Sequence, residues 1–335
     1  MINYPIFPLT TNQERVISDF NNNKNINFEY IKCEICNSEN FNELFKNDCW
    51  GFKVKLVYCK KCGFCFLNPR LDKQSLTYFY NSDTYRISYQ NNPNLKSSED
   101  LYQNYLKKVK DHIPPKPKLP NYKNYYESLY FDFINHNIND YQSVLDIGCG
   151  KGTKLIDFKN IGKEVTGLEF SNICVKILSE FGINIIQGNI DDLGNKKKYD
   201  LVILSHVFEH LTNLKEKMEK ISVLTKKYLY IEVPVNKKKL QIIQNAHNYY
   251  FSENTLNFFV LNSNFELIDL KYSNIGKPGE YLLALYKKKE TQSKFEYNFV
   301  SEVKKMKFLY LKFCFTALKT KVINIFIKIF KFRNK

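Results

Sequence analysis

The chain has 335 residues, a formal net charge of +16 and a hydrophobic content of 44%. Such a length fits two modest domains or one enzyme domain with additions, and such an apolar content excludes a globally disordered protein. Ten Lys and Arg residues, and no acidic residue, fall within 303–335, which leaves +6 for the rest of the chain. A chain whose excess positive charge lies mainly in its C-terminal tail argues less for nucleic-acid binding than a uniformly basic chain would.

The N-terminal stretch MINYPIFPLTTNQER lacks the positive segment and the apolar run of a secretory signal. No stretch approaches the run of about 18 uncharged apolar residues that a membrane-spanning helix needs. The expectation is therefore a cytoplasmic protein without a membrane span. In that compartment, nine cysteines favour thiols or metal ligands over disulfides.

Residues 1–26 are polar and rich in Asn, which predicts a partly unstructured start. Over 27–68, short aromatic and β-branched runs alternate with cysteines, a pattern typical of small β-hairpins. The cysteines form one pair in KCEIC and a second pair in YCKKC, and both pairs have C-x2-C spacing. Each pair can therefore occupy two corners of a tetrahedral metal site.

Two such pairs on neighbouring hairpins supply the four soft ligands that zinc prefers. The expected ligands of one closed, structural zinc site are Cys33, Cys36, Cys59 and Cys62. Four free thiols are the alternative, and Cys65 is the only substitute ligand. A redox role is disfavoured because no thioredoxin-like βαβ pattern surrounds either pair.

The stretch 72–141 is rich in Tyr, Asn and Lys and predicts helices at about 97–112 and 124–138. The prolines of IPPKPKLP separate them, because proline is not tolerated in a helix interior. From 143 onward, apolar runs such as SVLDIG and YDLVILS alternate with helical segments of about ten residues. This alternation predicts βαβ units and a mainly parallel sheet. A helix at 252–261 and two further strands, FELIDLKYS and EYLLALYKK, follow.

The stretch VLDIGCGKG, at 144–152, places three glycines directly after a predicted strand. Gly148, Gly150 and Gly152 give G-x-G-x-G, which matches neither the dinucleotide fingerprint nor the P-loop. The glycines still let the main chain approach a ligand at the strand ends. Glu169 ends the next strand, where a carboxylate can accept hydrogen bonds from both hydroxyls of a ribose. Asp146, directly before the loop, suits a cationic or amine-bearing ligand. The alternative interpretation of the whole loop is a tight turn in a protein that binds no cofactor.

Together, VLDIGCGKG and VTGLEFS resemble class I S-adenosylmethionine-dependent methyltransferases, over roughly 142–290. The resemblance implies an α/β, Rossmann-like domain with seven strands, the last of which, EYLLALYKK, runs antiparallel. It implies that the glycine loop lines the amino-acid end of the cofactor, and that Asn189 and Ile190 flank adenine; many relatives have Asp in place of Asn189. The implied cofactor contacts are Asp146, Gly148, Cys149, Gly150, Gly152, Glu169, Asn189, Ile190, Ser205 and His206. For Cys149, a purely structural role is the alternative.

Three histidines are candidates for the methyl-transfer site. His206, in SHVFEHL, follows the fourth strand and is the first candidate, as a cofactor contact or a base. His210 and the adjacent Glu209 either belong to this site or form a local structural pair. His247 precedes the helix capped by Ser252 or Asn254, and relatives carry a similar His before FS. It faces the substrate or is structural.

The segment CKKCGFCFLNPRLDKQSLTYFYNSDTYR is similar to the zinc-binding segment of sugar C-methyltransferases and of related enzymes encoded with surface-polysaccharide genes. The sugar C-methyltransferases carry a further C-terminal domain, whereas about 45 residues follow position 290 here. The expected acceptor is therefore the looser class, a sugar nucleotide or a surface-glycan precursor. The alternatives are an rRNA-type methyltransferase whose zinc ribbon recognises RNA, and a catalytically silent cofactor- or glycan-binding protein.

The C-terminal tail is apolar and basic but segregates its charges poorly. On a helix, Lys305, Lys312 and Lys319 share one side, while Lys321, Lys328 and Lys335 lie on roughly the opposite side. A weak contact with an anionic membrane surface is one expectation, at the inner membrane, and a solubilising helix is the other. The expected divisions of the chain are 1–71 with the zinc ribbon, 72–141 as a helical linker, 142–290 as the methyltransferase domain, and 291–335 as the tail.

Overall fold

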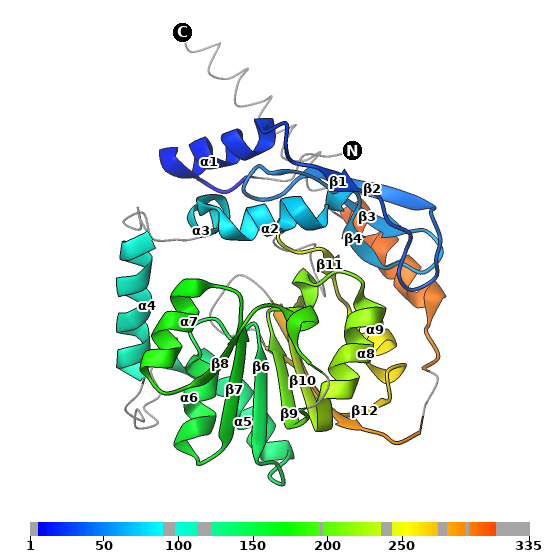
Figure 1. The fold of residues 1–335 in the computed structure, drawn as a ribbon. Helices are drawn as coiled ribbons and strands as arrows, with labels where there is room; N and C mark the ends of the chain where they lie inside the picture. Colours follow the sequence, from blue (N-terminus) through cyan, green and yellow to red (C-terminus); the bar gives the residue numbers. More distant parts are fainter. Residues whose placement is uncertain are drawn as a thin grey trace, which may run out of the picture.

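The larger of two main β-sheets has seven strands in the order β12–β13–β10–β9–β6–β7–β8 (Figure 1). The computed structural model describes residues 6–89, 98–112, 122–194, 197–235, 243–273, 280–291 and 295–312. The strands are β6 Ser143–Ile147, β7 Glu164–Glu169, β8 Asn184–Gln187, β9 Tyr199–Ser205, β10 Thr225–Val235, β12 Phe265–Ser273 and β13 Glu280–Lys288. β13 runs antiparallel to both neighbours, and β6 to β10 pair in parallel. The predicted seven-stranded, Rossmann-like fold is confirmed.

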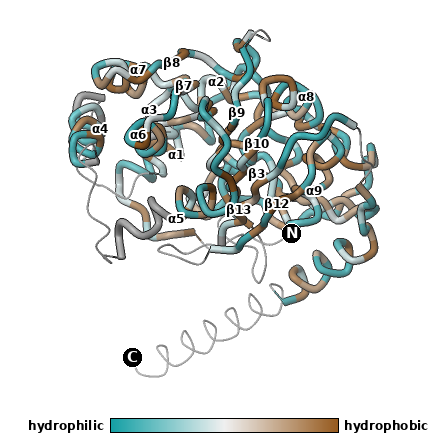
Figure 2. The backbone as a smooth tube through the Cα atoms, turned by 90° about the horizontal axis from the view of Figure 1, so that it is seen from below, coloured by the Kyte–Doolittle hydropathy of each residue, from teal (hydrophilic) through white to brown (hydrophobic). Residues whose placement is uncertain are grey.

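Helices cover both faces of this sheet because neighbouring residues of a strand point to opposite sides. Val202 and Leu204 of β9 join the core under α8 (Leu214–Leu224) and α9 (Glu253–Leu261). Leu201 and Ile203 join the core under α5 (Tyr122–Asn137). Three more helices pack together at the β8 edge: α4 (Ser98–His112), α6 (Thr153–Asn160) and α7 (Asn172–Glu180). Apolar and polar residues alternate along α4 and α8, as helices with one buried face require (Figure 2).

The smaller sheet has four strands in the order β11–β4–β3–β2. Three come from the cysteine-rich region, β2 (Phe41–Asn47), β3 (Lys53–Cys59) and β4 (Cys65–Leu67), while β11 (Tyr249–Tyr250) comes from the segment after β10. Phe64 stacks on Tyr249 with 5.6 Å between the ring centroids, and it also contacts Phe259 of α9. The cysteine-rich sheet and the seven-stranded sheet therefore share one hydrophobic core.

The helices α2 (Lys73–Asn81) and α3 (Asp83–Ser88) lie above the carboxyl ends of the parallel strands (Figure 1). A two-stranded sheet of β1 (Phe28–Glu29) and β5 (Arg70–Leu71) precedes them. Near the N-terminus, residues Thr11–Asn22 form the helix α1, although the polar composition of 1–26 predicts a partly unstructured segment. A capping box between Thr10 and Gln13 begins this helix, and Phe20 is buried on its inner face. The prediction overlooked this amphipathic pattern.

The expected helices at 97–112 and 124–138 correspond to α4 and α5. IPPKPKLP, at 113–120, and the tail 313–335 lie outside the described residues. Residues 299–312 form a helix on the surface of the cysteine-rich region. Tyr297 Oη donates a hydrogen bond of 2.9 Å to the carbonyl of Cys62, just before this helix. Among the residues that the structure describes, no helix is long and apolar enough to cross a membrane.

Replacement of Gly63 by Ala tests the contact between this C-terminal helix and the cysteine-rich region. Gly63 has a φ of +79°, and an added Cβ would lie 2.7 Å from the carbonyl carbon of Glu302. We expect Gly63→Ala to lower the free energy of unfolding by about 1–2 kcal/mol from backbone strain and by roughly 1–3 kcal/mol more from the clash. Gly162→Ala, at φ +80° with nothing within 4 Å, is the matched control for strain alone. Equal losses in urea denaturation would contradict the packing of this helix.

Candidate functional site

The two cysteine pairs come together in one cluster, with every Sγ atom within 4.8 Å of the other three. Cys33 Sγ lies 3.4 Å from Cys62 Sγ, and Cys36 Sγ lies 3.5 Å from Cys59 Sγ. A tetrahedral zinc ion with bonds of about 2.3 Å would hold its sulfur ligands about 3.8 Å apart. The cluster therefore has the dimensions and the donor atoms that a closed zinc site requires.

Both pairs lie on turns of the same geometry. The amide of Asn37 donates to the carbonyl of Cys33, and the amide of Gly63 donates to the carbonyl of Cys59, both at 2.8 Å. Asn37 and Gly63 share a positive φ, of 56° and 79°, which reverses the chain directly after each pair. This repeated turn points the two thiols of each pair toward the other pair.

The protonation of the cluster is shared among its thiols. Hydrogen bonds from Cys33 and Cys62 lower the pKa of Cys59, while the contacts with Cys59 raise the pKa of Cys33. One sulfur of the group is therefore ready to ligate as a thiolate. Cys65 is buried in the separate core beneath α1, where burial raises its pKa, so it lies outside the cluster.

The glycine loop after β6 has three left-handed residues. Gly148, Gly150 and Gly152 have φ values of 66°, 54° and 69°. A Cβ at Gly148 would lie 2.6 Å from Val207, and one at Gly152 would lie 2.4 Å from Leu178, whereas Gly150 has nothing within 4 Å. The outer glycines are thus required by packing, and Gly150 leaves the loop open for a ligand.

Glu169 holds this loop in place from the end of β7. Its Oε2 accepts a hydrogen bond from the amide of Gly150, and its Oε1 accepts one from the amide of Ser171, both at 2.8 Å. Asp146 lies behind the loop, almost fully buried, and burial raises its pKa to about 7, with Glu169 and Glu232 adding to the effect. The loop therefore faces a concentration of carboxylates.

A hollow of about 780 Å³ opens beside Glu169. This volume is in the range of small-molecule and cofactor sites. Its lining residues are Asn81, Phe170, Ser171, Asn172, Ile173, Gln187 and Gly188. Sequence reasoning missed Phe170, although it directly follows Glu169, and it had no signal for Asn81, which α2 brings from a distant part of the chain.

Three residues expected at the cofactor lie as follows. Asn189 is exposed and caps the 3-10 helix η1 (Ile190–Asp192), with its Oδ1 accepting from the amide of Asp191 at 2.7 Å. Ile190 is buried in the main core beside this turn. Cys149 is half-buried, and its Sγ would lie 2.7 Å from a Cβ at Gly167, so a small side chain is needed at both positions.

His206 directly follows β9 and lies between two carboxylates, those of Glu232 in β10 and of Glu209, three residues further on. Its Nε2 is 3.4 Å from Glu232 Oε1, and its Nδ1 is 3.6 Å from Glu209 Oε1. Ser205 Oγ donates to the second oxygen of Glu232 at 2.7 Å. Burial alone would lower the pKa of His206, but Glu209 and Glu232 raise it to about 9. His206 is therefore cationic at pH 7 and has no free lone pair with which to act as a base.

His210 and His247 lie together beyond His206, with ring centroids 4.8 Å apart. His210 belongs to the 3-10 helix η2 (Phe208–His210), and its Nδ1 lies 2.8 Å from both the Ala246 carbonyl and Tyr80 Oη. Burial lowers the pKa of both imidazoles, that of His247 to about 3. The site therefore joins one cationic histidine to two neutral ones, and α2 contributes Tyr80 to it.

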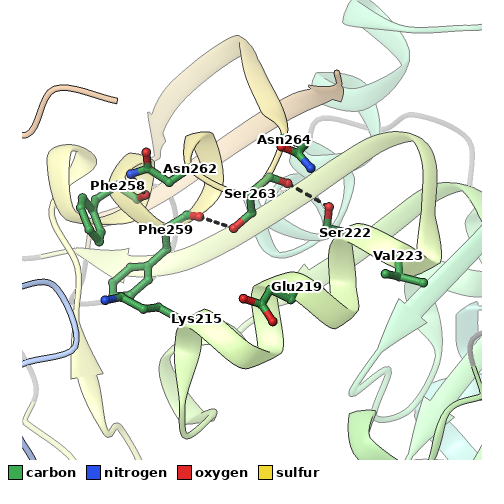
Figure 3. Close-up of a pocket in the computed structure, with 9 residues that line it drawn as sticks. All are labelled: Lys215, Glu219, Ser222, Val223, Phe258, Phe259, Asn262, Ser263 and Asn264. Carbon is green, nitrogen blue, oxygen red and sulfur yellow. Dashed lines mark hydrogen bonds between the residues drawn. The ribbon is translucent and has the colours of Figure 1, made fainter. Parts of the chain in front are cut away.

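A second hollow, of about 380 Å³, lies between α8 and α9 (Figure 3). Ser222 Oγ donates to the carbonyl of Ser263 at 2.9 Å, and Ser263 Oγ donates to the carbonyl of Phe259 at 2.8 Å. Ser222 and Val223 lie at the end of α8, directly before the amino end of β10, whereas the glycine loop follows the carboxyl end of β6. The hollow is therefore separate from the histidines and from Glu169.

The methyltransferase domain family matches residues 103–270, which is half of the chain. Over 89 residues the chain is 33% identical to ubiquinone biosynthesis O-methyltransferase of Rickettsia bellii (strain OSU 85-389). Over 91 residues it is 32% identical to the protein of the same name from Rickettsia prowazekii (strain Madrid E). The two matches cover 25% of this chain and 37% and 36% of the relatives. The chain thus spans little more than a third of the curated relatives that it matches.

Solved structures with a detectable likeness include 1,6-didemethyltoxoflavin-N1-methyltransferase of Burkholderia thailandensis, with 18% identity and a TM-score of 0.40 over 53% of this chain and 94% of that one. A methyltransferase structure from Bacillus halodurans C-125 has 14% identity and a TM-score of 0.42 over 48% of this chain and 99% of that one. The family match and the strand order confirm the predicted enzyme class, a Rossmann-like methyltransferase.

Replacement of Glu232 tests the charge state of His206. Glu232→Gln removes a negative charge 3.4 Å from Nε2, and we expect the pKa of His206 to fall from about 9 by one unit or more. Because the folded-state pKa lies above the ordinary 6.5, the stabilisation from His206 is complete below pH 6.5 and is lost as the pH rises toward 9. NMR titration of the imidazole measures the shift, and an unchanged pKa would show that Glu232 does not control this histidine.

Proposed function

We propose, since the chain belongs to the methyltransferase domain family, that it transfers a methyl group from S-adenosylmethionine to a sugar nucleotide or another surface-glycan precursor. The observation that carries the proposal is the open glycine loop, whose Gly150 amide is bonded to Glu169 beside a hollow of about 780 Å³. The acceptor class rests on the resemblance of the cysteine-rich segment and of the Tyr-rich helix after it. The name of the curated relatives agrees with a small acceptor.

The donor would lie along the carboxyl ends of β6, β7 and β8. Glu169 would accept hydrogen bonds from the ribose hydroxyls, which are stronger for an ionised acceptor. The hollow beside Phe170 would hold the adenine ring. Glu209 and Glu232, with His206 between them, leave a net negative charge at the methyl end. That charge complements the sulfonium and the amino group of the donor.

In the transfer, a lone pair or carbanion of the acceptor forms the bond to the methyl carbon while the sulfonium–carbon bond breaks, and sulfur keeps the electron pair. The chain's contribution is to hold the two reactants in line and to remove a proton where the acceptor carries one. His210 and His247 are neutral and can accept that proton, whereas the cationic His206 cannot. We therefore assign His206 to the donor and the other two histidines to the acceptor.

The cysteine cluster would bind one structural zinc ion through Cys33, Cys36, Cys59 and Cys62. Two matched turns and four converging thiols support this assignment. All four positions of a tetrahedral ion would be occupied by protein, which leaves none for substrate. The ion would stabilise the cysteine-rich region, and through it α2, over the site.

Methyl-labelled S-adenosylmethionine, incubated with the purified protein and a cell extract, tests the proposed acceptor. We expect label in the nucleotide-sugar or lipid-linked glycan fraction. Label in RNA would replace the proposal with the RNA methyltransferase alternative. No label in any fraction, together with measurable donor binding, would favour the silent binding protein. The Glu169→Ala variant, which should transfer little label, is the background control.

Removal of the Glu169 carboxylate should weaken donor binding. Glu169→Ala loses charge-assisted hydrogen bonds worth about 1.5–3 kcal/mol, so we expect the calorimetric affinity for S-adenosylmethionine to fall tenfold or more. Glu164→Ala, at the exposed opposite end of the same strand, is the matched control and should bind normally. Equal affinities in the two variants would refute the placement of the donor at Glu169.

Metal analysis tests the cysteine site. We expect the purified chain to contain zinc held by thiolates, and Co²⁺ that replaces it should show sulfur-to-metal charge-transfer absorption. Cys59→Ser should lose this absorption and part of the stability, because metal binding contributes directly to folding. Cys49→Ser, at a buried cysteine outside the cluster, is the control. A well-folded protein without thiolate-bound metal would contradict the assignment.

A further inference from the structure

Glu209 is a carboxylate that the fold buries without a hydrogen bond. Its side chain is fully inaccessible, and neither oxygen accepts a hydrogen bond from any residue that the structure describes. The two imidazoles within ion-pair range, His206 at 3.6 Å and His210 at 3.9 Å, are beyond hydrogen-bonding distance. A buried carboxylate is normally paired with a positive charge and hydrogen-bonded, or it coordinates a metal. His206 supplies the charge for Glu209, but the hydrogen bonds that its two oxygens would normally accept are missing among the described residues.

His210 presents a lone pair to the same place. Its Nδ1 lies 2.8 Å from the carbonyl of Ala246 and 2.8 Å from Tyr80 Oη. A carbonyl can only accept, whereas a hydroxyl can donate or accept, so the tautomer that suits both contacts carries the proton on Nδ1. In the neutral ring the lone pair then belongs to Nε2, the atom that faces Glu209 Oε1. A ring N–H that donates to a backbone carbonyl is also one of the contacts that orient metal-binding histidines.

His247 completes the group. Its Nδ1 is buried and has no hydrogen-bond partner among the described residues. One potential ligand atom from each of Glu209, His210 and His247 lies within 4.8 Å of the other two. Metal bonds of about 2.1 Å would place these atoms about 3.4 Å apart, so small side-chain movements would close the site around an ion.

We propose that Glu209, His210 and His247 bind a divalent first-row transition-metal ion, in a second metal site separate from the four cysteines. Two imidazoles and one carboxylate are the donor set of catalytic metal sites, which keep coordination positions open. The ion would bind the unsatisfied oxygens of Glu209 and one ring nitrogen of each histidine. The cysteine cluster, with softer ligands, would take its own zinc.

The role of the ion rests on the proposed function. The three ligands lie next to His206, at the carboxyl ends of the parallel strands, on the side to which α2 brings Tyr80. An oxygen of the acceptor could occupy an open position, and a cation there would lower the pKa of a bound hydroxyl. Neither histidine would then need to take up the proton itself.

The test counts bound metal in the full chain. The protein is saturated with Zn²⁺, freed of unbound ion by gel filtration and analysed by mass spectrometry of the metal. We expect two zinc ions per chain, falling to one in Glu209→Gln and in His247→Gln. His136→Gln, which removes an exposed histidine of α5, is the matched control and should keep two. A count of one in the native protein, or of two in both variants, would overturn the proposal.

Cobalt distinguishes the sites if a variant folds poorly. When the native protein is titrated with Co²⁺, one equivalent should give thiolate charge-transfer absorption and a second should give only the weaker bands of nitrogen and oxygen ligands. Absence of the second spectrum overturns the site. The methyl-transfer assay is independent of this result: label transfer without the second metal sinks this inference alone, and two metals without label transfer sink the proposed function alone.

Discussion

The pairing of β11 with β4 is the constraint on which the arrangement of the site depends. Two residues from the segment after β10 complete a sheet whose other strands precede residue 68. The pairing fixes Tyr249 beside Phe64, and the aromatic core that results is continuous with the core under α9. Because the cysteine-rich sheet is held there, α2 lies over the strand ends and Tyr80 reaches His210.

A polar network reinforces this junction from inside the first cysteine turn. Glu34, between Cys33 and Cys36, accepts a hydrogen bond from the amide of Leu214 at 2.6 Å, at the start of α8. It also accepts one from Tyr249 Oη, which in turn accepts one from Arg70. The turn that carries two thiols thus fixes the beginning of a helix of the methyltransferase domain. The cysteine cluster is therefore joined by hydrogen bonds to the segments that carry the histidine site.

The features of the fold that are encoded within one short stretch of sequence could be predicted. The glycine loop and the acidic end of β7 each follow from a short stretch whose apolar and glycine pattern is decisive. The antiparallel direction of β13 was implied by the resemblance to class I methyltransferases and by no local pattern. Contacts between distant segments left no such signal. A two-residue strand such as β11 is too short for a periodic pattern, and nothing local reveals that Tyr80 will contact His210. The burial of Glu209 was also hidden, because a glutamate next to two histidines reads as a polar surface turn.

The strand order of the smaller sheet has a consequence for how the chain acquires its structure during synthesis. Strands β2, β3 and β4 leave the ribosome long before β11, since about 180 residues separate Leu67 from Tyr249. Until then, β4 presents an unpaired edge, and Phe64 lacks Tyr249 and Phe259, two of the aromatic rings that cover it. Exposed strand edges of this kind promote association between chains. A metal ion gathered early by the four cysteines would order the nascent hairpins while they wait for their last strand.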